Sequence, residues 1–296
     1  MKKYIPFFIA TLVLFISCQK VVDADGLLDI EAKVFITSYI SPQDTVLRVN
    51  VSRALPVFGT PLSVRDQEAN QEKFLIKDAQ VTISDEAGNN SNLSYSEEDR
   101  TYLADASTLA IRSNQSYFLK VIVDGSEYNA SCRIPEKVAE INERINFRES
   151  NFGGREVDIN LAFQDAEEGR SFYILGGFVA TTFQIEGEEP QTFDFGLFFE
   201  SDEFLSDNLE DGGTLSGSAF FNVGSDVDVM ENTVTLQVAH VEEALFQNLK
   251  TASTNADADG NPFVEYAIAP NNIQEEGAVG VFAGYQLTEK VVELEL

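Results

Sequence analysis

Short runs in which apolar and polar residues alternate recur along this chain of 296 residues, and they constrain its fold more than any other feature. Clear examples lie at Leu47–Val51, Tyr117–Val123, Val157–Phe163 and Val234–Val238. A period of two residues places every second side chain on the same face of an extended strand, so each run suits a sheet with one buried face. Because 44% of the residues are hydrophobic, the chain can also form packed cores. The sequence therefore predicts a mostly β protein.

The first group of runs predicts one domain over residues 28–137. It holds six or seven short strands, which is typical of an immunoglobulin-like β-sandwich. Asp124-Gly125 predicts a two-residue hairpin turn, because both positions of such a turn require positive φ. The charged stretch Val64–Lys77 interrupts the spacing of the strands and predicts a loop insertion. Pro135 ends the last strand and marks the expected domain border.

The second group predicts a larger, acidic antiparallel β domain over residues 138–296. One short helix is expected at Val241–Thr251, where apolar residues share a face, with Glu242 and Glu243 near the N-terminus. A closing strand is expected at Val292–Leu296.

The N-terminus resembles a bacterial lipoprotein signal. Lys2–Lys3 is followed by the apolar run Ile5–Ile16 and then by Ser17-Cys18. The apolar run is too short to span a bilayer comfortably. We therefore expect residues 1–17 to be a signal peptide and Cys18 to carry a covalent lipid, with residues 18–27 as a polar tether. The alternative is a plain secretory signal that is cleaved elsewhere.

The charge of the chain is strongly negative. The net charge is −29, and from Val138 onward there are 31 acidic and 6 basic residues. Such a surface repels nucleic acids and anionic lipid headgroups, so no nucleic-acid partner is expected. It accepts basic partners and divalent cations, although solubility alone also explains it.

Residue types that carry catalysis are scarce. Cys132 lies on the apolar side of an alternating run, which predicts a buried structural thiol. His240 is the single histidine and continues the phase of Val234–Val238, so a structural role is expected. No nucleophile elbow, phosphate loop or HExxH motif is present. The absence of tryptophan counts against a dedicated glycan-binding module. The sequence thus favours a protein that is not an enzyme.

One segment resembles the first half of a calcium loop. Asn255, Asp257 and Asp259 alternate and are followed by Gly260, as oxygen ligands and a sharp turn require. Glu265 lies one position short of the usual bidentate acid, and Pro262 is unfavourable for the loop. Calcium is therefore weighed against an ordinary turn-rich loop, and no other cofactor is expected.

Several short motifs resemble a known family. In the first half they include Val49-x-Val51-Ser52-Arg53 and the hairpin Tyr117–Pro135. The second-half motifs are Phe163-x-Asp165, Phe172-Tyr173, Phe204-x-Ser206-Asp207, Gly260-Asn261-Pro262-Phe263, Asn272-Ile273 and Gly280-Val281-Phe282-Ala283-Gly284-Tyr285. In this order they resemble a family of uncharacterised lipoproteins from Bacteroidota outer membranes, known only as a domain of unknown function.

The resemblance implies a function at the outer membrane. Genes of this family often lie beside TonB-dependent receptors of the starch-utilisation type, which implies a non-enzymatic accessory role in substrate capture or receptor stabilisation. Two alternatives stay open: a surface adhesin or matrix-binding module, and an acidic glycan-active enzyme. The nutrient and the membrane face, surface or periplasmic, stay open. We expect interaction residues in two motifs: Gly260, Asn261, Pro262, Phe263, Gly280, Phe282 and Tyr285.

Overall fold

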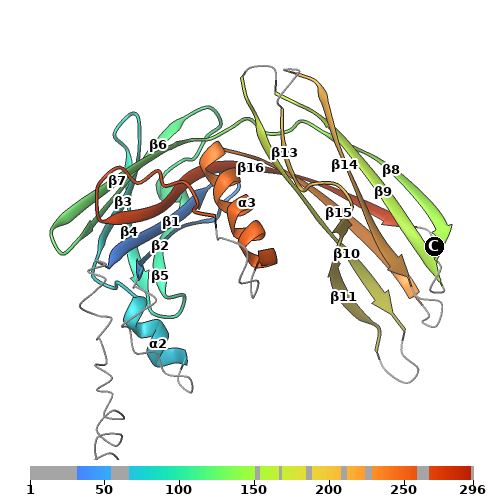
Figure 1. Cartoon of the computed structure of the whole chain (residues 1–296), viewed down its shortest axis with the longest axis horizontal. Helices are drawn as coiled ribbons and strands as arrows, with labels where there is room; N and C mark the ends of the chain where they lie inside the picture. Colours follow the sequence, from blue (N-terminus) through green and yellow to red (C-terminus); the bar gives the residue numbers. More distant parts are fainter. Residues whose placement is uncertain are drawn as a thin grey trace, which may run out of the picture.

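The fold comes from a computed structural model that describes most of the predicted strands. It describes residues 32–54, 67–150, 154–166, 169–184, 189–207, 212–223, 229–258 and 267–294. The expected signal peptide, Cys18 and the tether lie outside these residues. The described chain forms two β-rich lobes side by side, with one helix at their junction (Figure 1). The predicted mostly β class is confirmed.

The first lobe wraps its strands around one apolar core. The strands are β1 (Lys33–Ile40), β2 (Val46–Ala54), β3 (Gln80–Asp85), β4 (Asn90–Ser96), β5 (Thr101–Asp105), β6 (Ser116–Val123) and β7 (Ser126–Arg133). They pair in the order β1-β2-β5-β4-β3-β6-β7. The predicted hairpin turn is confirmed, because Asp124 and Gly125 join β6 to β7 with φ of 51° and 84°. The expected loop insertion instead contains a short helix, α2 (Gln67–Phe74).

The second lobe stacks two sheets face to face. One contains β10 (Phe172–Phe183), β11 (Gln191–Gly196), β13 (Phe204–Ser206) and β15 (Val229–Val241). The other contains β8 (Ile141–Glu149), β9 (Arg155–Gln164), β12 (Phe198–Phe199) and β14 (Thr214–Val223). The alternating residues of β9 and β15, Val157–Phe163 and Val234–Val238, fill the core between the sheets. The alternating residues thus lie on the buried inner faces of the two sheets, as their period of two predicted.

A single long strand, β16 (Ala278–Leu294), belongs to both lobes. Its first part pairs in parallel with β1, from Val34↔Ala278 to Ile40↔Gly284. Its second part pairs antiparallel with β15, from Val241↔Tyr285 to Asn232↔Leu294. One sheet consequently runs through the whole molecule, and Figure 1 shows β16 crossing from one lobe to the other. Ile273, Ala278 and Phe282 complete the core of the first lobe, although they lie far beyond Pro135 in sequence.

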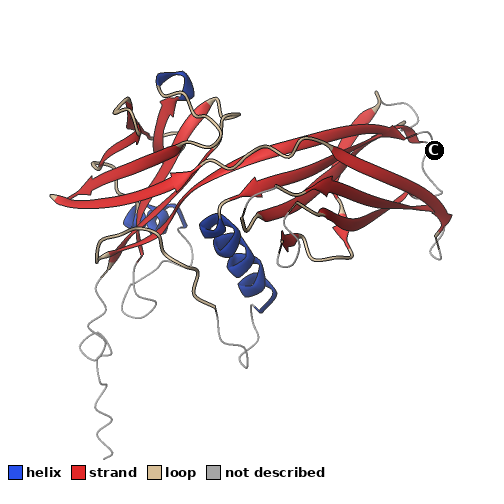
Figure 2. Cartoon of the chain, turned by 90° about the horizontal axis from the view of Figure 1, so that it is seen from above, coloured by secondary structure: helices blue, strands red, loops and turns tan. Residues whose placement is uncertain are grey.

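The helix α3 (Glu243–Ala258) covers the sheet where the two lobes meet (Figure 2). It begins two residues later than predicted, because Val241 is the last residue of β15, and it extends past Thr251. Leu245 and Phe246 are buried against Phe172 on β10 and against Val281 and Ala283 on β16. The apolar face of α3 thus fixes the helix across strands from both lobes.

Candidate functional site

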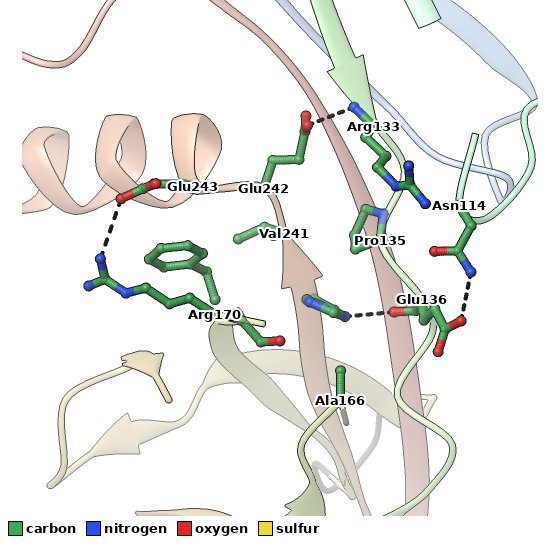
Figure 3. A pocket seen from close by; sticks show the side chains of 12 residues that line it. Asn114, Arg133, Pro135, Glu136, Ala166, Arg170, Val241, Glu242 and Glu243 are labelled. Atoms are coloured by element: carbon green, nitrogen blue, oxygen red, sulfur yellow. Dashed lines mark hydrogen bonds and ion pairs between the residues drawn. The ribbon is translucent and has the colours of Figure 1, made fainter. Parts of the chain in front are cut away.

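A polar pocket of about 790 Å³ lies at the junction of the two lobes. Its walls come from the end of β7, the segment that follows it, the end of β15 and the start of α3 (Figure 3). Its lining residues are Asn114, Arg133, Pro135, Glu136, Ala166, Arg170, Ser171, Phe172, His240, Val241, Glu242 and Glu243. Ligand sites are concave and carry a few convergent polar groups, and this pocket is more polar than most of them. These residues form the candidate site.

Glu242 holds the pocket together at the start of α3. One carboxylate oxygen accepts the backbone N–H of Arg133 at 2.6 Å, and the other accepts the backbone N–H of Gly284 at 2.7 Å. Burial raises the pKa of Glu242, and these two hydrogen bonds partly oppose the rise. One side chain thereby connects α3 to β7 and to β16.

His240 lies in the pocket wall and is buried, with 8% of its surface exposed. Its Nδ1 lies 2.7 Å from the carbonyl oxygen of Glu136. A carbonyl oxygen can only accept, so Nδ1 carries the proton in this contact. The ring also packs against Tyr173, with centroids 4.6 Å apart. Burial lowers the pKa of His240, which keeps the imidazole neutral near pH 7. These contacts fit the structural role predicted from the sequence.

Behind this wall, three separate sequence motifs meet around a buried acid. The Tyr173 hydroxyl donates to Asp165 Oδ1 at 2.6 Å. The backbone N–H of Ser171 donates to Asp207 Oδ1 at 3.0 Å. Burial raises the pKa of Asp165, and the neighbouring Asp207 raises it further. Asp165 is 4% exposed, so this cluster connects β9, β10 and the segment after β13 rather than facing a ligand.

The groups that do face the pocket carry both signs of charge. Arg170 lies over the ring of Phe172 and 3.7 Å from Glu243. Asn114 donates to Glu136 at 2.6 Å, and Arg133 reaches toward the same corner (Figure 3). Within the described part of the chain, no acid lies within ion-pair distance of the Arg133 guanidinium. Such a site can bind a polar ligand by hydrogen bonds, whereas its histidine and the buried Asp165 behind its wall are already occupied by protein contacts.

The structure separates the residues of the predicted interaction motifs. Gly280 and Phe282 lie inside the first lobe, and Tyr285 is half-buried in a different hollow on the sheet. A Cβ on Gly280 would lie 1.8 Å from the carbonyl oxygen of Ile36, and its φ of 142° also suits glycine. This glycine is thus needed for the close approach of β16 to β1. Residues 260–263 lie outside the described residues.

The structure tests the predicted burial of Cys132 fully and the prediction of a calcium loop only in part. Cys132 is 4% exposed, and burial raises the pKa of its thiol, so the predicted burial of this cysteine is confirmed. Asn255 lies in α3, and its side-chain amide donates to Ala267 O and accepts from Ala267 N, both at 2.9 Å. A calcium ion would have to displace these bonds. The backbone of Asp257 is helical, and Asp259 lies outside the described residues, so calcium stays a prediction.

The pocket residues that sequence patterns missed are Arg133, Glu136, Arg170 and Glu242. Arg133 lies in the hairpin motif Tyr117–Pro135, but nothing in that motif marks the arginine as a pocket residue. The other three residues lie outside the quoted motifs. The border at Pro135 is the one sequence signal near them, because a junction between lobes is a common place for a pocket.

The comparisons with known proteins identify a family. A family profile described as "Domain of unknown function (DUF4249)" matches residues 22–291. The chain belongs to this family. The expected match to an uncharacterised family is thereby confirmed. A search of curated proteins finds no match. Within the described ranges, the helices are all too short or too polar to cross a bilayer.

Proposed function

We propose that this DUF4249 protein is a lipid-anchored, non-enzymatic accessory of a TonB-dependent transporter in the outer membrane. The observation that carries the proposal is the junction pocket. It is a concave polar site, and the histidine in its wall is committed to a hydrogen bond with the carbonyl oxygen of Glu136. Such a site binds a ligand without transforming it.

The expected lipid anchor at Cys18 supports the same proposal. The basic, apolar and small-residue pattern before Cys18 resembles a lipoprotein signal. A short tether would hold the two lobes close to the membrane, and the strong negative charge would keep them away from anionic lipid headgroups. The pocket would then face solvent near a transporter and take part in substrate capture.

Affinity purification from native membranes tests the proposal. The full-length protein, tagged at its C-terminus, is isolated in mild detergent under several growth conditions. We expect a β-barrel receptor to co-purify in stoichiometric amount, and Cys18→Ala to abolish fractionation with the outer membrane. Membrane association that survives this substitution would refute the anchor. Consistent absence of a receptor would contradict the transport role, and enrichment of matrix components instead would favour the adhesin alternative.

A further inference from the structure

A second hollow, of about 390 Å³, lies beside α3 on the sheet face shared by the two lobes. Its lining comes from β1, β2, β10, β15, β16, the turn between β1 and β2, and α3. The lining residues are Tyr39, Asp44, Val46, Arg48, Ile174, Ala239, Val241, Leu245, Leu249 and Tyr285. Most of these side chains are apolar, and the volume suits a small organic molecule. This hollow is distinct from the polar junction pocket.

Asp44 supplies the negative charge of this hollow. Its Oδ2 accepts the backbone N–H of Ser41 at 2.7 Å, and its Oδ1 accepts the hydroxyl of Tyr285 at 2.9 Å. Each carboxylate oxygen keeps a further acceptor position. Among the described residues, no basic group lies within ion-pair distance of Asp44. A half-buried carboxylate therefore stands at an apolar hollow without a cationic partner.

Two tyrosines and one arginine complete the polar part of the lining. Tyr39 and Tyr285 add aromatic rings, and ring faces attract cations. Among the described lining residues, Arg48 is the one basic side chain. It is half exposed and lies 3.9 Å from Asp99, which is outside the hollow. The guanidinium of Arg48 thus pairs with Asp99, and the carboxylate of Asp44 is left without a cationic partner in the hollow.

We propose that this hollow binds a small amphipathic organic cation. The apolar body of the ligand packs against Val46, Ile174 and Leu249, and its ammonium group donates hydrogen bonds to Asp44. A neutral apolar ligand would cover the carboxylate without giving it a donor, which is unfavourable. An anion would be repelled by Asp44 and by the net charge of −29. This binding site does not depend on the proposed transport role.

Calorimetric titration of the full chain with three indoles of similar shape tests the proposal. Tryptamine carries an ammonium group, tryptophol a neutral hydroxyl, and indole-3-acetate a carboxylate. At about 0.15 M salt, where exposed charges are screened beyond roughly 8 Å, we expect saturable one-site binding of tryptamine. Tryptophol should bind at least tenfold more weakly, and indole-3-acetate should not bind. Equal binding of the three, or binding of none at millimolar concentration, would overturn the proposal.

Variants locate the site. Asp44→Asn removes the charge at nearly constant shape. Its one carbonyl oxygen can still accept from Ser41 N–H, and its NH2 group can donate to the Tyr285 hydroxyl oxygen. It should weaken tryptamine binding roughly 10- to 100-fold, as for a lost charge-assisted hydrogen bond. Ala239→Leu fills the hollow and should also reduce binding. Glu140→Gln removes an equal charge at an exposed position and should leave binding unchanged.

A further variant is expected to keep binding, so it distinguishes loss of the site from loss of folding. Tyr285→Phe frees Asp44 Oδ1 while keeping the ring, so it should bind tryptamine at least as tightly as the parent chain. Unchanged binding in both Asp44→Asn and Ala239→Leu would place the ligand elsewhere and refute the proposal.

Discussion

At the scale of single residues, Gly280 shows how the pairing of two strands depends on a missing side chain. Gly280→Ala would place Cβ 1.8 Å from the Ile36 carbonyl oxygen, at a φ of 142° that other residues rarely adopt. We expect the free energy of unfolding to fall by about 3 kcal/mol or more, through overpacking and backbone strain together. Chemical denaturation measures the loss.

Gly196→Ala is the matched control for this prediction. Gly196 also lies in a strand, but nothing lies within 4 Å of the position that its Cβ would take. We expect a change of less than about 1 kcal/mol. Equal losses in the two variants would show that β16 and β1 do not approach as closely as described.

His240 predicts a dependence of stability on pH. Burial lowers the pKa of His240 in the folded state, so the unfolded chain binds a proton that the folded chain does not. Its contribution to stability is therefore present above the ordinary histidine pKa of about 6.5 and is lost as pH falls toward the lowered value. Asp44 and Asp165, whose pKa values are raised by burial, act in the opposite direction at lower pH.

Comparison with His240→Gln isolates the contribution of the histidine, because the two acids are common to both chains. We expect the parent chain to lose stability relative to the variant between about pH 7.5 and pH 5.5, measured by urea denaturation at each pH. Parallel stability curves would mean that the imidazole is not kept neutral in the folded protein.

At the scale of elements, Glu242 connects the start of α3 to β7 and to β16. Glu242→Ala would leave the backbone N–H groups of Arg133 and Gly284 without their acceptor. We expect a loss of roughly 1–3 kcal/mol in the free energy of unfolding, because the N–H of the buried Gly284 would be left unsatisfied, whereas water can replace the acceptor of the exposed Arg133 N–H. The loss can be measured by thermal and chemical unfolding.

The neighbouring Glu243 provides a matched control. Its side chain is 59% exposed and lies 3.7 Å from Arg170. Exposed ion pairs contribute little, so Glu243→Ala should change stability by less than about 1 kcal/mol. A loss as large as that of Glu242→Ala would show that helix charge, rather than the two hydrogen bonds, stabilises the junction.

The elements also show which parts of the fold sequence reasoning can predict. Strands β9 and β15 were predictable because one face is buried and the other is not, which produces alternation. The first half of β16 was not, because the sheet there is covered on both faces and its residues form a continuous apolar run. The predicted closing strand, Val292–Leu296, overlaps only the end of β16, at Val292–Leu294. The junction pocket was also hidden, because its residues come from segments that are far apart in the sequence, and Arg170 belongs to no motif.

At the scale of the whole molecule, β16 joins the lobes by more than backbone pairing. Gln286, Thr288 and Lys290 donate side-chain hydrogen bonds to the carbonyl oxygens of Pro135, Val138 and Ile141, at 2.6, 2.7 and 2.9 Å. The chain that connects the lobes is therefore attached to the strand that they share. This arrangement explains how a pocket between two lobes can keep a fixed shape.

We predict that the two lobes unfold together. If β16 unfolds, β1 loses its partner in the first lobe and β15 loses its partner in the second. Because both lobes need this strand, their stabilities are coupled. Thr288→Val removes one of the connecting hydrogen bonds at nearly constant volume, and should lower the stability of both lobes by the same amount, about 1 kcal/mol.

Hydrogen exchange followed by mass spectrometry across a denaturant series tests this central claim most directly. Peptides from β6–β7 report on the first lobe, and peptides from β9 report on the second. The shared strand predicts that both sets lose protection at one denaturant concentration, and that Thr288→Val shifts both equally. Two separate transitions, with only one of them moved by the substitution, would contradict a single coupled body.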